Sequence, residues 1–444
     1  MATITRDSLF SWEIVGRSSQ ILLLKGILET LPDEALMAAL EGERKGRRDD
    51  YPLRAMWNSL LAGVLFGHET VASLIRELRR NAELREVCGF DVVKGEEAVP
   101  RDYVYSRFLK KLIRHSDEIE ALFDALVERL SELLADYGKD LAVDTKALRT
   151  WSRKDAQADS GTKTYGGVRE DGTLYERVVT WLGYKLHLVI DANWELPVAW
   201  ELTEASVADS PQLMPMIKEL ERKHPALIER TETLAGDKAY DDGADKAELY
   251  DEYGIAPLID TRDLHREVGG KMRPLDPQRH DTIYHSATGE VFCRTDPFAQ
   301  DDAKRFTRMN FMGFEQDRMA LKFRCPAAAY GIECKNREAC RSGATRHNSA
   351  WGRVVRVPLD VDRRLFLPIH RDSYTFERLY SKRTAIERVN SRLDNVYGFE
   401  RHFIAGKEKM TVRVGMALVV MLATAVACIE AGHAERARSL LRAA

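Results

Sequence analysis

The sequence predicts an α/β protein: a mixed sheet flanked by helices, preceded by an all-helical N-terminal region and interrupted by a large insertion. Three changes along the chain support this prediction. Residues 1–138 carry apolar residues at helical spacing, and residues 139–260 alternate short β-rich runs with helical segments. Residues 261–352 have few long apolar runs and many charges, and helical character returns in residues 353–444. We therefore expect a helical domain and a core that the insertion divides in two.

Length and charge set the first limits on function. The chain has 444 residues, enough for two or three domains. It contains 67 Lys and Arg against 70 Asp and Glu, a formal net charge of −3. A chain with this balance has no general attraction to nucleic acid. Any DNA-binding surface must therefore come from local segregation of basic residues.

No secretory or membrane segment is expected. Met1–Arg6 lacks the apolar centre and the cleavage site of a secretory signal. Val414–Ile429 is apolar and uncharged, but it is shorter than the roughly 18 residues that suggest a membrane span. Arg413 and Glu430 flank it closely. We predict a buried C-terminal helix and, with cysteine usage typical of a reducing compartment, a cytoplasmic protein that has no membrane partner.

Residues 1–138 predict short helices with basic faces. Ser59–Phe66 is an apolar helix centre, Thr70–Ala82 sets apolar residues opposite arginines, and Ile119–Leu134 repeats the apolar pattern. Such faces suit DNA binding, although an ordinary solvated helix surface explains them equally well. Further basic residues lie before the last of these segments, at Arg107, Lys110, Lys111 and Arg114.

Residues 139–260 predict elements in the order β-β-β-α-β-α-β. The segments 177–190 and 196–202 are rich in β-branched and aromatic residues and predict a three-strand meander around a turn at 191–193. This order allows the first and fourth strands to lie side by side. The remaining predicted strands are 140–144, 233–236 and 255–259, and the predicted helices are 209–224 and 240–253.

Three carboxylates stand out from the many acidic residues by their settings. Asp144 and Asp237 each end an apolar run, where an unpaired charge is normally avoided because desolvation is costly. In open α/β sheets, sites form at the carboxyl ends of adjacent strands, which would bring these two together. Glu387 lies on a helix predicted over Tyr374–Val396. Three converging carboxylates suit divalent metal ions that act on phosphate esters.

These residues resemble the DDE transposases of bacterial insertion sequences, in the branch whose glutamate lies in a Tyr-x2-Arg-x3-Glu-x6-Lys signature. Tyr380, Arg383 and Glu387 match that spacing, whereas Asp394 occupies the position of the final lysine. Leu234–Tyr240 resembles the block around the family's second aspartate. The resemblance extends over about residues 139–430, with similar blocks at 183–187 and 203–209 and a similar helical region at 50–115.

The resemblance implies a ribonuclease H-like fold and a metal-dependent transposase. Asp144, Asp237 and Glu387 would be the catalytic residues and would bind two Mg²⁺ ions, with Mn²⁺ as an alternative metal. The implied reaction is cleavage of one strand at the element end, followed by attack of the freed 3′-OH on target DNA. The implied partners are double-stranded DNA (terminal inverted repeats and target) and a second copy of the chain in a synaptic homodimer. The implied location is the bacterial nucleoid.

Two residues upstream of Glu387 are candidate DNA contacts. Tyr380 and Arg383 fall seven and four residues before it, so all three are expected on one helix face. A guanidinium matches phosphate in a bidentate fork, and an intrahelical ion pair between Arg383 and Glu387 is the alternative. Residues 362–413 contain twelve Lys and Arg against seven Asp and Glu, a local excess of five. This excess favours the passage of DNA here.

Three more residues are candidate contacts, with weaker support. Lys185 and His187 occupy alternate positions of one predicted strand and so face the same side. The family resemblance makes them DNA contacts or supports of the site, and a structural role for His187 is an equal alternative. Arg392 is a candidate replacement for the lysine that Asp394 removes.

The insertion holds four cysteines, which could satisfy a tetrahedral structural Zn²⁺. Their spacing lacks a tight Cys-x2-Cys pair, so unligated thiols are the alternative. The polar neighbours of the second and fourth are unlike ordinary core positions for cysteine. The four are Cys293, Cys325, Cys334 and Cys340.

Two other functions are compatible with these patterns. The first is a ribonuclease H-like nuclease that cuts without strand transfer, and the second is an inactive DNA-binding descendant. The helical N-terminal region and the large insertion favour transposition, because recognition of element ends needs extra surface. The presence of all three carboxylates argues against loss of catalysis.

Overall fold

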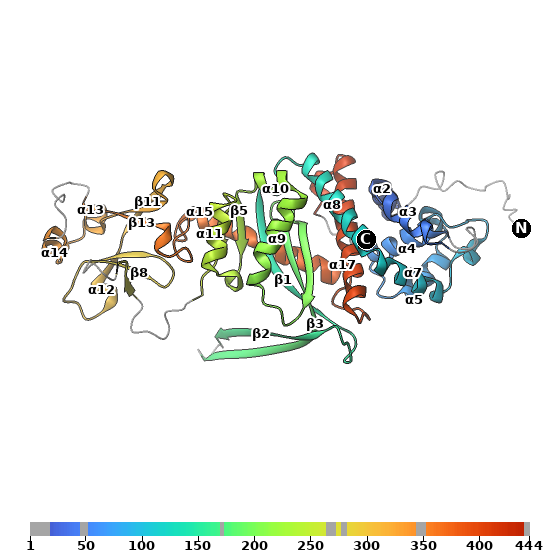
Figure 1. The fold of residues 1–444 in the computed structure, drawn as a ribbon, viewed down its shortest axis with the longest axis horizontal. Coiled ribbons are helices and arrows are strands. Elements are labelled where there is room, and N and C mark those ends of the chain that lie inside the picture. The colour runs from blue at the N-terminus through green and yellow to red at the C-terminus, as the bar shows by residue number, and fades with distance from the viewer. Residues whose placement is uncertain are drawn as a thin grey trace, which may run out of the picture.

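A computed structural model describes residues 18–44, 52–168, 173–262, 272–276, 282–342 and 352–438. Figure 1 shows three parts in a row: a helical N-terminal part, a central sheet with its helices, and a small β-rich part at the far end. Helix α17 (Lys407–Glu430) lies between the first two parts and packs against α2, α4, α8 and β4. The C-terminal helix thus joins the N-terminal helices to the sheet.

The N-terminal part is built from short amphipathic helices around an apolar centre. Most of α4 is buried, including the fully buried Trp57, because this helix lies at the middle of the group. Thr70 caps α5 by accepting a hydrogen bond from the Ser73 backbone N–H at 3.1 Å. The helices are α2 (Ser19–Thr30), α3 (Glu34–Gly42), α4 (Leu53–Leu65), α5 (Val71–Arg80), α6 (Ala82–Cys88), α7 (Asp102–Arg114) and α8 (Ser116–Leu133). The helices predicted over 59–66, 70–82 and 119–134 are confirmed as α4, α5 and α8.

The central sheet is mixed, with the strand order β4-β3-β1-β5-β6. β3 is antiparallel to both β1 and β4, whereas β1, β5 and β6 are parallel to one another. The first predicted strand therefore does lie beside the predicted strand 233–236. The strands are β1 (Asp140–Arg149), β3 (Leu174–Asp191), β4 (Leu196–Glu204), β5 (Thr233–Gly236) and β6 (Ala256–Ile259).

Helices cover the sheet and bury the parallel strands. All four residues of β5 and of β6 are buried, as expected for strands with helices on both faces. In Figure 1, α9 and α11 lie in front of the sheet. α16 packs against β1, and α17 packs against β4. The core helices are α9 (Ser210–Lys223), α10 (Pro225–Arg230), α11 (Gly243–Asp251), α15 (Tyr374–Tyr380) and α16 (Thr384–Asn395).

The predicted helix over 374–396 is not continuous. α15 ends at Tyr380, a 3₁₀ turn spans Ser381–Arg383, and α16 begins at Thr384. Lys382 in this turn binds Asp140 with Nζ 2.6 Å from Oδ2, which ties the turn to the start of β1. Tyr380, Arg383 and Glu387 therefore belong to three successive elements, and the prediction that they share one helix was wrong.

A long two-stranded ribbon extends from the sheet, and the sequence did not predict its first strand. β2 (Asp159–Val168) pairs along its full length with the first half of β3. The second half of β3 enters the central sheet. The strand predicted over 177–190 is therefore part of a single strand of 18 residues.

The β-rich part contains two small sheets around its own apolar cluster. That cluster includes Leu321 and Phe323 and extends to Phe366, beyond the predicted insertion boundary at residue 352. The first sheet has the order β10-β9-β8-β7 and the second β11-β12-β13. The strands are β7 (Met272–Pro274), β8 (Ile283–Ser286), β9 (Val291–Arg294), β10 (Phe306–Arg308), β11 (Asn310–Glu315), β12 (Ala320–Arg324) and β13 (Val354–Pro358), with short helices α12 (Asp302–Arg305), α13 (Pro326–Tyr330) and α14 (Arg337–Ser342).

Helix α17 is long and apolar enough to cross a membrane by length and composition alone. Within the protein, however, 89% of its most apolar stretch is buried. Its apolar surface is thus taken up by the N-terminal helices and by β4. The predicted buried C-terminal helix is confirmed.

Candidate active site

Asp144 and Asp237 are brought together by the parallel pairing of β1 and β5. In that register Val143 lies opposite Gly236, so the next residues of the two strands are the two aspartates. A larger residue at 236 would crowd this pairing, because a Cβ there would lie 3.1 Å from the Val143 side chain. The adjacency that the strand order predicts for Asp144 and Asp237 is therefore present.

The carboxyl group of Asp144 is held in an unusual environment. Its pKa is raised to about 6, chiefly by burial and also by the neighbouring charge of Asp237. The charges of Lys163 and Arg383 act in the opposite direction. Asp144 thus lies among one acidic and two basic side chains that come from three separate segments.

Asp237 is positioned by the backbone that follows β5. It caps the 3₁₀ turn Lys238–Tyr240, and its Oδ1 accepts a hydrogen bond from the Ala239 N–H at 2.7 Å. The buried Tyr240 at the end of this turn reaches back to β1, where its hydroxyl lies 2.9 Å from that of Thr145. The Gly-Asp-x2-Tyr pattern therefore has a local structural reason: the tyrosine fixes the turn that carries the aspartate.

Glu387 lies in the first turn of α16, with its side chain 58% exposed. Its Oε1 is 3.2 Å from Nη2 of Arg383. This is the Arg383–Glu387 ion pair that was considered as the alternative to DNA contact, although it joins the 3₁₀ turn to α16 and does not lie within one helix. The charge of Arg383 also lowers the pKa of Asp144, so the guanidinium acts electrostatically on a second of the three carboxylates.

Asn390 also belongs to the site, although the sequence did not indicate it. Its Nδ2 lies 3.5 Å from Oδ2 of Asp144, and its own Oδ1 is buried without a hydrogen-bond partner. Asn390 stands three residues after Glu387 and therefore follows it along the helix face. That helical spacing is the signal that could have identified it.

The three carboxylates do not form a ready metal cage. Among the described residues, no group of three His, Cys, Asp or Glu side chains is arranged to hold a metal ion. The donors nevertheless fit a hard divalent cation, because they are carboxylate oxygens at a sheet edge. The raised pKa of Asp144 agrees with a cation site. Burial and the charge of Asp237 disfavour the ionised carboxylate, and a bound cation would favour it.

Asp394, which stands where the signature has a lysine, forms an ion pair with a lysine of β1. Its Oδ2 lies 2.6 Å from Nζ of Lys146, on β1 two residues beyond Asp144. The Lys146 side chain is only 10% exposed. Lys146 therefore lies beside the position where the signature places a lysine. It comes from β1, and its acidic partner Asp394 comes from α16.

Lys185 and His187 are held by contacts within the protein. Lys185 donates to Oδ1 of Asp209 at 2.8 Å and to the Val207 carbonyl at 2.7 Å. His187 is fully buried, with Nε2 2.9 Å from the Thr203 hydroxyl, and burial lowers its pKa to about 4. These contacts support the structural alternative for His187.

Arg392 is buried, whereas Tyr380 is partly exposed. Arg392 is 6% exposed and binds the Glu195 carbonyl oxygen, so it faces the interior and not a DNA backbone. Tyr380 is half-buried and stacks on Phe376 at 5.6 Å, with the Arg383 guanidinium 5.8 Å from its ring centre. Burial raises the pKa of Tyr380, as do the charges of Asp260 and Asp237, which places this tyrosine on the Asp237 side of the site.

The four cysteines of the insertion gather at one end of its small sheets. Cys293 is buried on β9, and burial raises its pKa to about 12, with smaller contributions from the other three thiols. The segment that carries Cys334 is fixed to β9, since the Asn336 N–H donates to the Thr295 carbonyl at 3.1 Å. Cys325 and Cys340 are half-buried nearby. In the described part of the chain, the cysteines are not arranged as a ligand set for a metal.

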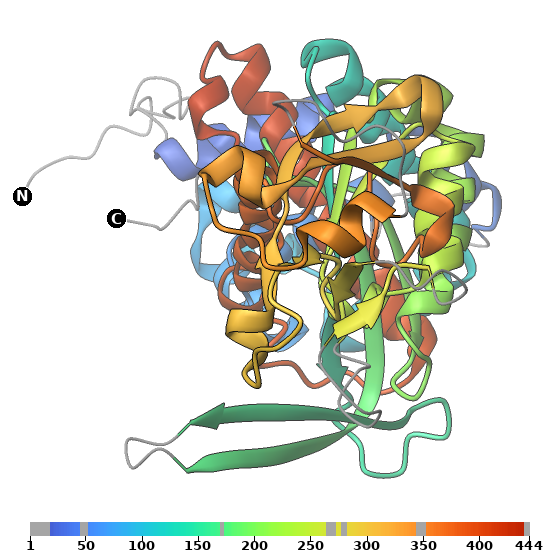
Figure 2. The same ribbon diagram turned by 90° about the vertical axis from the view of Figure 1, so that its left-hand side faces the viewer.

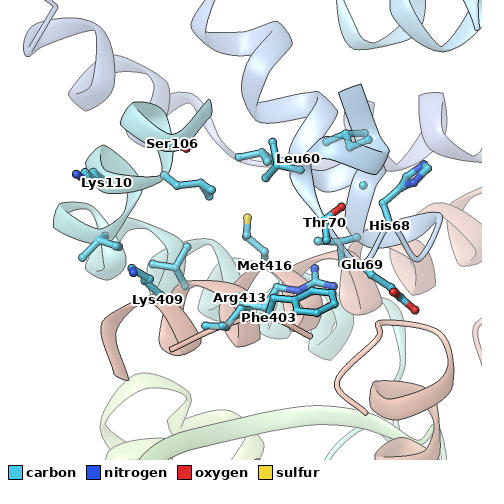
Figure 3. A pocket seen from close by; sticks show the side chains of 18 residues that line it. Leu60, His68, Glu69, Thr70, Ser106, Lys110, Phe403, Lys409, Arg413 and Met416 are labelled. Carbon is cyan, nitrogen blue, oxygen red and sulfur yellow. The ribbon is translucent and has the colours of Figure 1, made fainter. Parts of the chain in front are cut away.

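A cavity of about 510 Å³ lies elsewhere, between the N-terminal helices and α17 (Figure 3). Leu60, Met416 and Phe403 give it a largely apolar wall, and Lys110 and Lys409 stand at its edge. None of the three carboxylates lines this cavity. The candidate active site is thus the open edge of the sheet and not this pocket.

Family comparisons agree with the geometry. Residues 141–423 match the family described as Transposase DDE domain, and residues 18–111 match the family described as Transposase domain (DUF772). The first match covers well over half of the chain, so this chain belongs to the DDE transposase family. The resemblance inferred from Asp144, Asp237 and Glu387 is confirmed at the level of the family.

One solved structure is similar over most of the chain. It is described as a cryo-EM structure of a piggyBac transposase synaptic complex with hairpin DNA. The TM-score is 0.40 with 10% sequence identity, over 96% of this chain and 80% of that chain. A similarity of this size carries no argument about the present fold. No curated protein matches the chain.

Proposed function

We propose that this protein is a transposase that cleaves DNA at the ends of an insertion sequence and joins the freed 3′-OH to target DNA. The observation that carries the proposal is the register of β1 and β5, which sets Asp144 beside Asp237 at the carboxyl edge of the sheet. Glu387 on α16 would complete the site from the other side. The substrates would be double-stranded terminal repeats and target DNA, bound by a homodimer.

The strand arrangement supports a ribonuclease H-like core. Three antiparallel strands (β4, β3 and β1) continue into two parallel strands (β5 and β6) within one sheet, with helices on both faces. A third carboxylate would then come from a helix packed along the first strand. α16 has that place, because Asn390 reaches Asp144 and Asp394 reaches Lys146.

The proposed reaction is an in-line displacement at phosphorus. Two divalent ions, when bound between the carboxylates, would activate the attacking oxygen and stabilise the leaving one. The contribution of the chain is to hold Asp144 and Asp237 on rigid strand ends and to keep Arg383 where it can balance either Glu387 or a DNA phosphate. Mg²⁺ is the expected metal and Mn²⁺ a substitute, since both accept oxygen ligands.

Cleavage of the element's own DNA tests the proposal. A labelled linear fragment that carries the sequences flanking the coding region is incubated with the full chain, with and without Mg²⁺. We expect nicks at defined positions only when the metal is present, and none with Asp237→Asn. Asp237→Asn with unchanged cleavage would refute the site assignment. Cleavage that never leads to joined products would favour a nuclease without strand transfer.

A further inference from the structure

Helix α16 runs alongside β1, and two contacts fix which of their residues lie level with one another. Asn390 lies beside Asp144, with Nδ2 3.5 Å from Oδ2. Asp394 lies beside Lys146, with Oδ2 2.6 Å from Nζ. Four residues of helix rise about 6 Å, and two residues of strand rise about 6.6 Å. The two contacts therefore have the same spacing along both elements, and together they hold Asn390 level with Asp144.

The alignment of the helix with the strand continues before α16. Lys382, in the turn that precedes the helix, binds Asp140 at the start of β1, with Nζ 2.6 Å from Oδ2. From Asp144, β1 leads to the foot of the sheet, where the β2–β3 ribbon projects (Figure 1, Figure 2). Glu387 stands three residues before Asn390, so the two share a helix face. α16 therefore presents a carboxylate and an amide on one face, and the amide contacts Asp144.

The amide oxygen of Asn390 has no partner of its own. Oδ1 is buried, and the residues that the structure describes offer it no hydrogen bond. A buried polar atom without a partner costs free energy and requires an explanation. The other asparagine of α16, Asn395, is exposed, and its amide binds the Ser391 hydroxyl at 3.0 Å. Of the two asparagines, the one with an unused oxygen is thus the one that contacts a site carboxylate.

An amide oxygen suits the divalent ion proposed for this site. Mg²⁺ and Mn²⁺ prefer hard oxygen ligands, which include amide carbonyls. Because the amide is neutral, it adds an oxygen without adding to the repulsion between Asp144 and Asp237. A half-turn of the amide exchanges Oδ1 with Nδ2, so Asn390 can turn either atom toward Asp144. A glutamate followed by a second ligand three residues later is also the spacing of metal-binding residues in helical bundles.

We propose that Asn390 supplies a fourth ligand to the divalent-metal site, through its amide oxygen, next to the three carboxylates. This inference rests on the proposed function for the presence of the metal and adds a residue to the set that holds it. The alternative is that Asn390 only positions Asp144, by donating a hydrogen bond from Nδ2. The two roles depend on different atoms: a ligand needs the oxygen, whereas a positioning donor needs the N–H.

Binding of Mn²⁺ alone to the full chain separates the two roles. The electron paramagnetic resonance signal of the free ion is followed for wild type, Asn390→Leu and Asn390→Asp. Asn390→Leu removes both amide atoms, and we expect about 10- to 100-fold weaker binding. Asn390→Asp keeps an oxygen and loses the donor, so it should bind at least as tightly as wild type. Asn395→Ala is the matched control on the same helix and should bind as wild type, since Asn395 binds Ser391.

Thermal unfolding gives a second readout that does not depend on catalysis. With a chelator present, Asn390→Leu should melt no lower than wild type, because the change removes a buried oxygen that lacks a partner. Added Mn²⁺ should raise its melting temperature less than that of wild type, because weaker binding stabilises less. Asn390→Ala replaces Asn390→Leu in the titration if circular dichroism shows that the larger side chain disturbs the fold.

The outcomes separate this inference from its rivals. Asn390→Leu that binds Mn²⁺ as tightly as wild type would overturn it, and so would a wild type that binds no Mn²⁺. Equal losses in Asn390→Leu and Asn390→Asp would also overturn it and make Asn390 a positioning residue. Asn390-dependent Mn²⁺ binding by a protein that neither cleaves nor joins DNA would support the inference and refute the proposed function. Metal-dependent cleavage, with Mn²⁺ affinity independent of residue 390, would do the reverse.

Discussion

Lys146 and Asp394 form an ion pair, with Nζ 2.6 Å from Oδ2, that joins β1 to the last turn of α16. Lys146 stands two residues beyond Asp144, and Asp394 stands seven residues beyond Glu387. The pair therefore bridges the two elements that carry the first and third carboxylates. It holds α16 along β1, and with it the position of Glu387 relative to Asp144.

Reversing the charge of one partner should break the Lys146–Asp394 ion pair and lower the stability of the protein. Asp394→Lys places two lysines in a partly buried contact, and we expect a loss of about 1–3 kcal/mol in stability, because an uncompensated charge is left behind. Thermal unfolding measures the loss. The double variant Lys146→Asp with Asp394→Lys should recover most of it. A double variant no more stable than the singles would show that the contact does not position the helix.

Asp144→Asn should stabilise the protein near neutral pH. Because the folded-state pKa is raised to about 6, the folded protein binds a proton more tightly than the unfolded chain between about pH 4 and 6. The stability that protonation of Asp144 contributes is fully present below that pH window and is lost as the pH rises through it. The variant should therefore melt higher than wild type at about pH 7.5, and the difference should shrink toward about pH 4. A variant that melts lower at neutral pH would contradict the raised pKa.

Arg383→Gln should tighten binding of a divalent ion. The guanidinium is 3.2 Å from Glu387 and acts on Asp144, so its removal eliminates a cation that competes with the metal. We expect about three- to tenfold tighter binding of Ca²⁺ or Mg²⁺ by calorimetry. Arg388→Gln is the control, since Arg388 binds Glu195 at 2.7 Å instead. Equal changes in the two variants would show that Arg383 has no special place in the site.

The cysteines should differ in reactivity within the folded protein. Burial raises the pKa of both Cys88 and Cys293 to about 12, so neither should react with a thiol reagent at about pH 8. Cys325, Cys334 and Cys340 are half-buried and should react more slowly than in the unfolded chain. If all four insertion cysteines react only after a zinc chelator is added, they hold a metal.

Sequence patterns predict the parts of the fold that depend on local apolar runs. The run ending at Asp237 marks β5 to the residue, and the strand order correctly places it beside β1. β2 escaped prediction because Asp159–Val168 is rich in glycine and hydroxyl residues, with no alternation of apolar and polar positions. Most described residues of β2 are exposed on both faces of the ribbon, so neither face requires a row of apolar residues.

The adjacency of Asp144 and Asp237 was predictable from the sequence, but the partners of the surrounding side chains were not. Arg392 was a candidate replacement for the lysine that Asp394 removes, but Glu195, nearly 200 residues away, draws it into the interior. The turn at Ser381–Arg383 has no sequence signal either, since Lys382 is pulled toward Asp140 by a contact that exists only in the fold. Long-range ion pairs thus decide which basic side chains remain available to DNA.

Strand transfer from a pre-cut end tests the central claim most directly. A duplex that already exposes a 3′-OH at the element end is incubated with plasmid target and Mg²⁺, and joined products are counted. We predict joining by wild type and a fall of about 100-fold or more in Asp144→Asn, Asp237→Asn and Glu387→Gln, because each removes a carboxylate from the metal site. Joining that persists in Glu387→Gln, with protein folded as wild type, would contradict the three-carboxylate site.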